Sequence, residues 1–361
     1  MHSSNCHYDA LVFGKGPAAC IFAINLVRGG KAVLLVPPLN EPKQNAWAET
    51  LSPRGEFLLA KLGLADHILA NQHSTQMMLS CWKSSNPETI NFAFDPHGRM
   101  WHVDRQAFDK ALLTQSVYSG VDILDRESNR LSDFHRDGRQ WEIRIASSGQ
   151  ERIVKTDYLV DATGKASFLA RRMGARRAIL DHLVAISCIY EQTSSIAPLL
   201  IEPVSQGWWY SLGLLQRRTL AGFITDPKFV KLSSDIRKFT WYAMLENAPH
   251  TAQRLTKIGS SLTMASAESA CLDRMGGDGW LAIGDAAMSF DPLSSHGLCS
   301  AIEQAVDAAE ILCGPEPYSA LEDFVIKRKH FFAKYKAQRT AFYRAARRFS
   351  RDTFWQNRAV N

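Results

Sequence analysis

The sequence predicts an α/β fold with a mostly parallel central sheet, a separate antiparallel sheet inserted into it, and helices at the C-terminal end. An apolar run near Tyr8 leads into a glycine turn and a helix, and a second apolar run leads into Gly284-Asp285. Continuous apolar runs are typical of parallel strands that are buried on both faces. Between about residues 180 and 270 the chain changes to short β-rich runs, which indicate an antiparallel sheet.

The first apolar run, from Ala10 to Phe13, has the features of a strand that leads to a phosphate-binding turn. Gly14 permits the tight turn, Gly16 lets the backbone approach a phosphate, and Ala19 takes the place of the third glycine. Pro17 suits a first helical turn, where its missing N–H is no loss. The helix predicted from Ala18 to Arg28 offers free N–H groups to a pyrophosphate. The residues expected at the dinucleotide are Gly14, Gly16, Pro17, Ala18 and Ala19.

The second strand, predicted from Lys31 to Val36, departs from the usual dinucleotide pattern. Such a strand normally ends in an acid that hydrogen-bonds the adenosine ribose. Here Pro37-Pro38 follows the strand, and the nearest acid is Glu41, beyond the turn. One lost hydrogen bond is worth about 1 kcal/mol, so we expect somewhat weaker dinucleotide binding.

Two motifs in the middle of the chain point to the same ligand. Arg105 stands at a strand-to-helix junction, where its planar fork of donors can reach a phosphate or a flavin edge. The alternative is a surface ion pair with Asp104 or Asp109. A third apolar strand, Tyr158 to Asp161, runs into a turn at Gly164. Turns at the carboxyl ends of parallel strands are where open α/β sheets bind ligands.

The segment from Trp280 to Gly297 is the strongest single signal. Its strand delivers Asp285 to a helix start, where a carboxylate can accept hydrogen bonds from ribitol hydroxyls. Asp291-Pro292 closes a turn, and the next helix begins at about Ser294-Ser295-His296-Gly297. The positive end of that helix dipole would stabilise negative charge on a reduced flavin ring. Together with the N-terminal segment, this motif predicts a protein that binds FAD with both ends of its chain.

The β-rich region contains three consecutive aromatic residues, Trp208, Trp209 and Tyr210. Large aromatics in strands most often form core or interface. The functional alternative is an aromatic wall beside an aromatic substrate.

Composition excludes several other classes of protein. The chain is 46% hydrophobic and 22% charged, as in ordinary globular proteins. No apolar run reaches membrane-spanning length, and the early first strand leaves no room for a signal peptide. Seven cysteines without a CxxC pair or a ligand cluster predict a reducing, cytoplasmic location and no metal site.

The charge pattern gives weaker information about partners. A net charge of +6 could steer an acidic partner or simply favour an anionic dinucleotide. Lys and Arg are not interleaved with aromatics as in nucleic-acid readers, so no nucleic-acid binding is expected. The basic helical tail from Pro317 is expected to pack its apolar stripe on the body of the protein rather than on a membrane or a partner.

These motifs resemble those of the FAD-dependent aromatic monooxygenases and the flavin-dependent tryptophan halogenases, over nearly the whole chain. The subgroup that the chain resembles most is the LodB- and GoxB-like flavoproteins, which mature tryptophylquinone amino-acid oxidases. The stretch Gly207-Trp-Trp-Tyr-Ser, followed by Phe223-Ile-Thr-Asp226, is typical of that group.

The resemblance implies a Rossmann-like FAD-binding domain of the p-hydroxybenzoate hydroxylase type, formed by residues 1–75, 100–180 and 271–315. Residues 76–99 and 181–270 would form the inserted β-sheet domain for substrate or partner, and residues 316–361 a C-terminal helical segment. The FAD contacts implied are Gly14, Gly16, Pro17, Ala18, Ala19, Glu49, Arg105, Ala162, Gly164, Gly284, Asp285, Pro292, Ser295, Gly297 and Leu298.

The resemblance also implies a reaction. A monooxygenase of this kind would hydroxylate a tryptophan side chain in a partner protein, the precursor of a quinone-containing amino-acid oxidase. Reduced flavin would bind O2, form a C4a-hydroperoxide and transfer oxygen to the ring. His296 would lie beside the flavin as proton donor or substrate positioner, or would only make a structural hydrogen bond. Without a second glycine fingerprint, the reductant could be NAD(P)H or free reduced flavin.

Two other functions stay open at this point. A small-molecule aromatic hydroxylase or halogenase would use the same cofactor. The halogenases carry a Trp-x-Trp-x-Ile-Pro segment and a lysine, whereas this chain has Trp208-Trp-Tyr-Ser-Leu-Gly, and the context of Lys83 does not match. Halogenation is therefore disfavoured. The second alternative is an FAD-binding chaperone that holds the partner while its quinone forms by other means.

Overall fold

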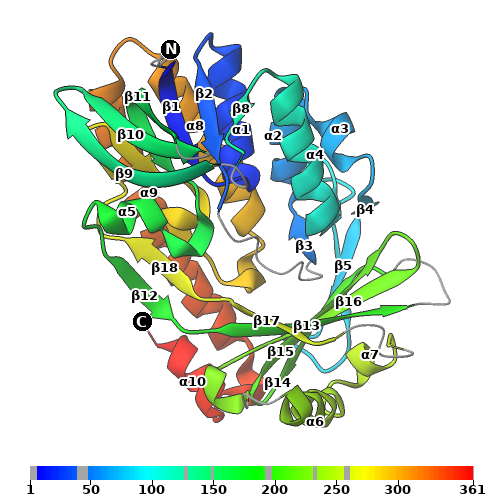
Figure 1. Ribbon diagram of the computed structural model, residues 1–361. Coiled ribbons are helices and arrows are strands. Elements are labelled where there is room, and N and C mark those ends of the chain that lie inside the picture. The colour runs from blue at the N-terminus through cyan, green and yellow to red at the C-terminus, as the bar shows by residue number, and fades with distance from the viewer. Residues whose placement is uncertain are drawn as a thin grey trace.

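The computed structural model describes residues 6–38, 48–125, 129–147, 150–191, 197–230, 234–255 and 261–360. Two large sheets form its framework, one near the N-terminus and one at the opposite end of the molecule, with helices packed around them (Figure 1). Glu41, the acid nearest to the second strand, lies outside the described residues. Within the described ranges, no helix is both long enough and apolar enough to cross a membrane.

The central sheet confirms the predicted parallel arrangement. Its strands follow the order β19-β20-β11-β1-β2-β8, and β1 is parallel to both β11 and β2. Strand β20 lies parallel to β11 on the other side, so the two ends of the chain meet in one sheet. Its strands are β1 (Cys6–Phe13), β2 (Val33–Val36), β8 (Asp122–Ile123), β11 (Gln150–Asp161), β19 (Gly276–Gly277) and β20 (Trp280–Ala282), and a hairpin of β9 (Asn129–Asp137) and β10 (Gln140–Ser147) extends β11.

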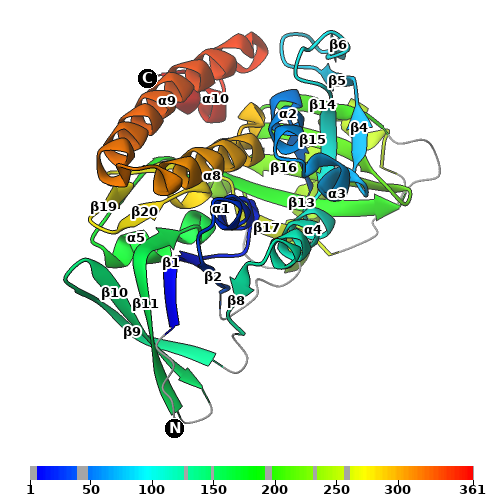
Figure 2. The ribbon, with the colours of Figure 1, turned by 90° about the horizontal axis from the view of Figure 1, so that it is seen from above.

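Helices α1 (Pro17–Arg28) and α8 (Gly297–Cys313) lie side by side on this sheet (Figure 2). Helix α1 begins after Gly16 with Pro17 in its first turn and ends at Gly29, as the sequence predicts. Small side chains on α8, such as Ala305 and Ala308, are fully buried and allow close packing. This pairing brings the starts of both helices to the same edge of the sheet.

A smaller layer completes this half of the molecule. Strands β3 (Ala48–Leu51), β4 (His73–Thr75) and β7 (Met100–Asp104) form an antiparallel sheet. The helices of this layer are α2 (Pro53–Lys61), α3 (Ala65–Leu69) and α4 (Arg105–Tyr118). Asp104 caps α4 by accepting hydrogen bonds from the backbone N–H groups of Gln106 and Ala107. Arg105 therefore stands at the start of that helix.

The second large sheet has seven strands in the order β17-β13-β16-β15-β14-β5-β6, and all its pairs are antiparallel except β14 with β5. Its inner face is turned toward the central sheet. Its outer face carries α6 (Ser234–Leu245) and α7 (Pro249–Ala252), two helices in a region that the sequence predicts as strands (Figure 1). The strands are β5 (Met77–Ser80), β6 (Glu88–Asn91), β13 (Val184–Glu191), β14 (Leu199–Val204), β15 (Gly207–Leu214), β16 (Arg218–Thr225) and β17 (Thr263–Ser266).

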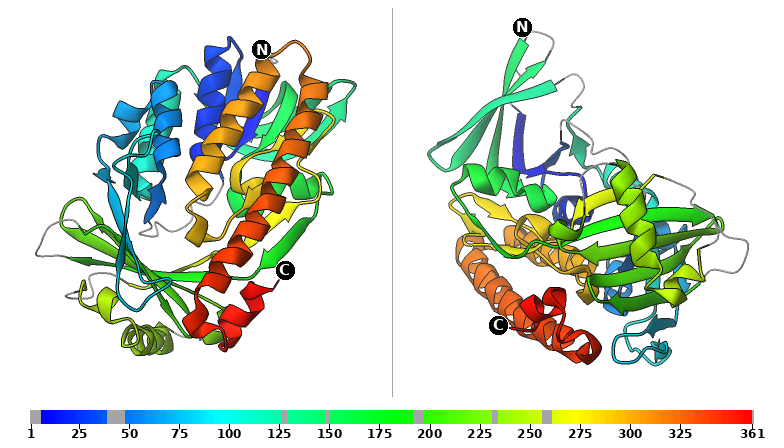
Figure 3. Two further views of the ribbon diagram at one scale, coloured as in Figure 1. Left: turned by 180° about the vertical axis from the view of Figure 1, so that it is seen from behind. Right: turned by 90° about the horizontal axis from the view of Figure 1, so that it is seen from below.

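The two large sheets are joined by a three-stranded sheet and by the C-terminal helices. The small sheet contains β12 (Arg177–Asp181), β18 (Ser269–Leu272) and β21 (Met288–Ser289), near the short helix α5 (Phe168–Arg172). Helix α9 (Pro317–Ala345) runs along the back of the molecule from one half to the other and leads to α10 (Thr353–Ala359) (Figure 3). As predicted, the tail buries its apolar stripe on the body and leaves most of its lysines exposed.

Buried His102, on β7, connects the β3-β7-β4 sheet to the second large sheet. Its Nδ1 donates a hydrogen bond to the Gly213 carbonyl of β15 at 2.8 Å, while its Nε2 is buried without a partner among the described residues. Burial lowers the pKa of His102 to about 4, although the hydrogen bond to Gly213 opposes this shift. His102 is therefore neutral in the folded protein at neutral pH.

We predict that this histidine makes folding sensitive to mild acid. The unfolded chain binds a proton at a pKa of about 6.5, whereas the folded chain resists protonation down to a pKa of about 4. The contribution of neutral His102 to the free energy of unfolding is therefore fully present above pH 6.5. About 3 kcal/mol of it is lost as the pH falls to about 4. Denaturant unfolding across this range should show a smaller loss for His102→Asn than for the wild type. The exposed His67→Asn variant is the control, and equal losses in all three proteins would contradict the assignment.

Candidate active site

The glycine motifs from the two ends of the chain meet at the carboxyl edge of the central sheet. Gly14 follows β1 with φ +133°, and a Cβ there would lie 2.3 Å from the carbonyl oxygen of Ala162, which follows β11. Gly284 follows β20 with φ +61°, and its Cβ would lie 2.8 Å from the Cβ of Ala18. Both positions require glycine because of their backbone angles and because of these close approaches.

The start of α1 has the properties of an anion site. Gly16 is its N-cap, and no side chain among the described residues caps the first turn. A Cβ at Gly16 would meet no described atom within 4 Å, so the space in front of these N–H groups is open. Free N–H groups and the helix dipole favour a bound phosphate at such a helix end.

A cavity of about 410 Å³ lies next to this edge, between the two large sheets. Seven of the predicted site residues from the FAD side line it: Glu49, Arg105, Asp285, Pro292, Ser295, His296 and Gly297. The second sheet contributes Leu199, Ile201, Trp208, Tyr210 and Leu212. Within the described part of the chain, the remaining predicted FAD residues lie outside this lining, on the sheet edge and helix starts: Gly14, Gly16, Pro17, Ala18, Ala19, Ala162, Gly164, Gly284 and Leu298.

Arg105 is held by two carboxylates at the cavity wall. It pairs with Glu49 on β3 and, through its Nη2, with Asp109 one turn along α4 at 3.1 Å. Burial opposes ionisation, but the two carboxylates raise the pKa of the guanidinium above its ordinary value. Of the two ion-pair partners considered from the sequence, Asp109 is bound, whereas Asp104 pairs with Arg218 at 2.9 Å. Arg105 is therefore a fixed cation that faces the cavity.

Asp285 presents a carboxylate to the cavity. No residue in the described ranges donates a hydrogen bond to this carboxylate. Burial raises the pKa of Asp285, and the nearby ammonium of Lys165 opposes this rise. A carboxylate in this position suits the hydroxyls of a ribityl chain, which would supply the missing donors.

His296 precedes α8 and also lines the cavity. Its ring lies 6.2 Å from that of Phe290 and 5.9 Å from that of Phe331, measured between centroids. Burial lowers the pKa of His296, and Glu303 acts weakly in the opposite direction. The imidazole is therefore neutral at pH 7 and can accept a proton.

The aromatic triplet divides between the two faces of its sheet. Trp208 and Tyr210 line the cavity. Trp209 does not, because successive residues of a strand point to opposite faces. It packs beneath α6, with its ring 4.8 Å from Phe223 and 4.6 Å from Trp241. The three residues alternate across the sheet as expected, so Trp209, unlike the other two predicted substrate residues, does not line the cavity.

Lys165 lines the cavity, although its sequence context did not predict a role for it. It directly follows Gly164 in the turn after β11, and its Nζ donates to the Ser266 carbonyl at 2.5 Å. Its place after a predicted ligand-binding turn was the signal that could have identified it. Lys83, which the sequence analysis weighed as a halogenase lysine, is exposed beyond β5.

Comparison with known proteins defines the class of this site. Residues 7–322 match the family described as FAD binding domain, and the chain belongs to that family. FAD is its cofactor, and the protein is an enzyme of the flavin-dependent monooxygenase class. The uncapped helix start, the crowded glycines and the Asp285 carboxylate in the cavity lining fit this cofactor.

Among curated relatives, the chain is similar to LodB of Marinomonas mediterranea, which is named as an FAD-dependent oxidoreductase. The two are 26% identical over 361 residues, covering 97% of this chain and 96% of LodB. The chain is also 23% identical to 1H-pyrrole-2-carbonyl-(peptidyl-carrier protein) brominase of Pseudoalteromonas luteoviolacea, over 84% of this chain and 77% of the brominase.

Solved structures share the fold. The flavin-dependent halogenase CmlS superposes with a TM-score of 0.85 at 20% identity, covering 98% of this chain and 68% of CmlS. The peptidyl tryptophan dihydroxylase QhpG, essential for tryptophylquinone cofactor biogenesis, superposes with a TM-score of 0.78 at 22% identity, covering 98% of this chain and 79% of QhpG.

Two glycine variants should separate folding from cofactor binding. Gly16→Ala should fold with unchanged stability, because its Cβ meets no described atom, but it should bind FAD more than about tenfold more weakly because the methyl group occupies the phosphate site. Gly14→Ala should lose about 3 kcal/mol of folding stability from strain and collision with Ala162. FAD titration and denaturant unfolding measure the two effects, and unchanged FAD affinity in Gly16→Ala would contradict this placement of the pyrophosphate.

Proposed function

We propose that this protein hydroxylates a tryptophan side chain within a partner protein, the precursor of a quinone-containing amino-acid oxidase. The similarity to LodB extends over almost the full length of both chains. The fold is also that of a peptidyl tryptophan dihydroxylase. The name of the dihydroxylase specifies a peptidyl substrate, which favours a protein substrate over a free small molecule.

The observation that carries the proposal is the cavity itself. The FAD-binding edge supplies one wall, and Trp208 and Tyr210 supply part of the opposite wall. Apolar side chains such as Leu199 and Ile201 complete that wall. An indole ring that enters between the walls would meet aromatic faces on one side and the cofactor on the other. The volume of about 410 Å³ is in the range of small-ligand sites.

The residues of the cavity have separate tasks in this reaction. Bound FAD would supply oxygen activation: one atom of O2 would enter the indole ring, and the other would be reduced to water with two electrons from an external reductant. Trp208 and Tyr210 would orient the indole. The neutral imidazole of His296 would accept the proton that the ring loses when it becomes aromatic again. The reductant would be NAD(P)H or free reduced flavin.

The partner would approach a basic protein. The net charge is +6, and α9 exposes several lysines, including Lys327, Lys329, Lys334 and Lys336. Such a face attracts an acidic protein surface and increases the rate of encounter. We therefore expect association with the partner to weaken as ionic strength rises.

One co-expression experiment tests the proposal. A candidate oxidase precursor is produced with and without this protein, and its tryptic peptides are weighed. We expect one tryptophan to gain oxygen only when the flavoprotein is present. His296→Gln should lower this yield while FAD stays bound, and His97→Gln, at a histidine away from the cavity lining, is the matched control. An unmodified precursor beside folded, FAD-loaded flavoprotein would contradict protein hydroxylation, and full modification by His296→Gln would favour the chaperone alternative.

A second function, halogenation, is favoured by Lys165. Halogenases need a lysine beside the substrate to capture hypohalous acid, and Lys165 places an ammonium group in the cavity lining. The same co-expression with bromide in the medium distinguishes the two reactions. Bromine in the modified peptide or in free indoles, lost in Lys165→Met with FAD retained, would establish halogenation. Oxygen alone would establish hydroxylation.

A further inference from the structure

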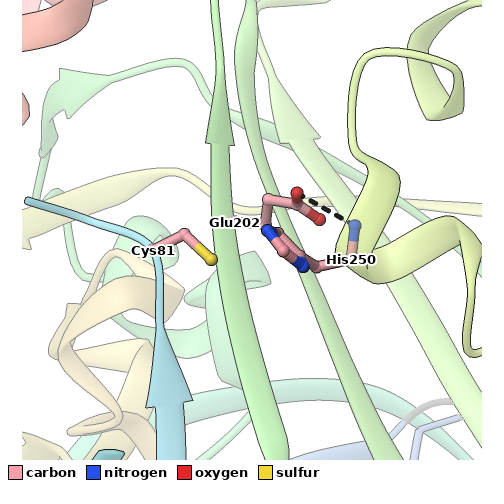
Figure 4. Close-up of side chains that lie close together, drawn as sticks. All are labelled: Cys81, Glu202 and His250. Carbon is pink, nitrogen blue, oxygen red and sulfur yellow. Dashed lines mark hydrogen bonds between the residues drawn. The ribbon is translucent and has the colours of Figure 1, made fainter. Parts of the chain in front are cut away.

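Three potential metal ligands converge on the outer face of the second large sheet, away from the cavity. They are Cys81 after β5, Glu202 on β14 and His250 at the start of α7 (Figure 4). One potential ligand atom from each lies within 4.8 Å of the others. Cys81 and Glu202 are buried and His250 is partly buried, so this is an internal cluster rather than an exposed acidic patch.

We propose that Cys81, Glu202 and His250 form a zinc site that fastens β5 and α7 to β14. Thiolate, imidazole and carboxylate are the ligand types that zinc uses in proteins. A tetrahedral zinc ion holds its ligand atoms roughly 3.5 Å apart, so small side-chain rotations would bring these atoms to bonding distance. A water molecule would complete the coordination.

Each ligand is already oriented by its surroundings. The Nε2 of His250 donates to the Ser85 carbonyl at 3.0 Å, which leaves its Nδ1 with a free lone pair. Metal-bound histidines typically donate their second ring N–H to a carbonyl or carboxylate in this way. The backbone of Cys81 is fixed by its own N–H, which donates to the Ile201 carbonyl at 2.8 Å, and by Arg348, which donates to the Cys81 carbonyl at 2.7 Å.

Glu202 caps α7, and its carboxylate can still bind a metal ion. Its Oε2 accepts from the backbone N–H and the hydroxyl of Thr251, each at 2.7 Å. Its Oε1 accepts the backbone N–H of His250 at 3.2 Å. A carboxylate oxygen has two lone pairs, so Oε1 can still bind a metal while the cap is kept.

Neighbouring charges select the kind of metal. Arg254 and Arg348 lie close to the cluster, and each donates to a backbone carbonyl, of Pro198 and Cys81 respectively, at 2.7 Å. Their positive charge weakens the binding of a cation that relies on electrostatics alone. Calcium and magnesium rely on oxygen ligands and charge. Zinc gains additional bonding from sulfur and nitrogen, so the cluster favours zinc over these hard cations.

The zinc site would support the cavity wall that the second large sheet forms. Glu202 follows Ile201 on β14, and Ile201 lines the cavity from the other face of the same strand. Cys81 pairs with this strand through the Ile201 carbonyl. Zinc on the outer face would therefore stiffen the strand that bears cavity-lining residues. This role is independent of the reaction proposed above.

The proposal is tested by treating the full-length, tag-free, FAD-loaded protein with a chelator and then titrating it with zinc. We expect one zinc per chain by metal analysis, a higher Tm with zinc, and a thiolate-to-metal absorption band when cobalt replaces zinc. Cys81→Ser should weaken zinc binding by more than about 100-fold, since even loss of a second-shell partner costs 10–100-fold. His250→Ala should do the same.

Cys271→Ser is the matched control, because Cys271 is a partly buried cysteine outside the cluster. It should bind zinc as the wild type does. The far-UV circular dichroism of all zinc-free variants confirms that they fold. Absence of stoichiometric zinc in the wild type, or equal zinc binding by Cys81→Ser and Cys271→Ser, would overturn the proposal.

Discussion

The buried carboxylate of Asp291 links the C-terminal helices to a loop that lines the cavity. It accepts hydrogen bonds from Arg339 Nε at 3.0 Å and from the Tyr343 hydroxyl at 2.8 Å, both on α9. Its own N–H donates to the Tyr335 hydroxyl at 2.7 Å. Arg339 also pairs with Asp181, which Arg358 on α10 contacts as well. Removing one partner from such a buried network is costly, because the remaining charges lose their compensation.

The consequence for the site is that residues far apart in the chain act as one unit. The loop that begins at Asp291 carries Pro292, Ser295 and His296 into the cavity wall. The central sheet holds the glycine turns, and the second sheet holds the opposite aromatic wall. Helix α9 spans both halves (Figure 3). The gap between the walls is therefore set by α9 and by the strands, and not by the loop alone.

The sequence alone predicted those parts of the fold and the site that depend on residues close together in the chain. The strand–glycine–helix order around Gly14 and the Gly284-Asp285 turn depend on neighbours within a few residues, so their pattern predicted the central sheet and FAD. Alternation of Trp208, Trp209 and Tyr210 across the sheet was expected, but which of them faces the cavity depends on how the strand is placed in the fold, which the sequence does not give. Glu202 lies 121 positions after Cys81, and His250 lies 48 positions after Glu202, so only tertiary packing brings them together and spacing gave no signal. Helices α6 and α7 were missed because the short apolar runs around them indicated strands.

The measurement that tests the role of α9 most directly is FAD affinity in the Arg339→Met variant. We expect this variant to lose about 3 kcal/mol in the free energy of unfolding and to bind FAD markedly more weakly, because the Asp291 loop loses its support. Lys336→Ala, at an exposed position on the same helix, should change neither quantity. A folded Arg339→Met protein that binds FAD as tightly as the wild type would contradict the claim that α9 positions this cavity-lining loop for FAD.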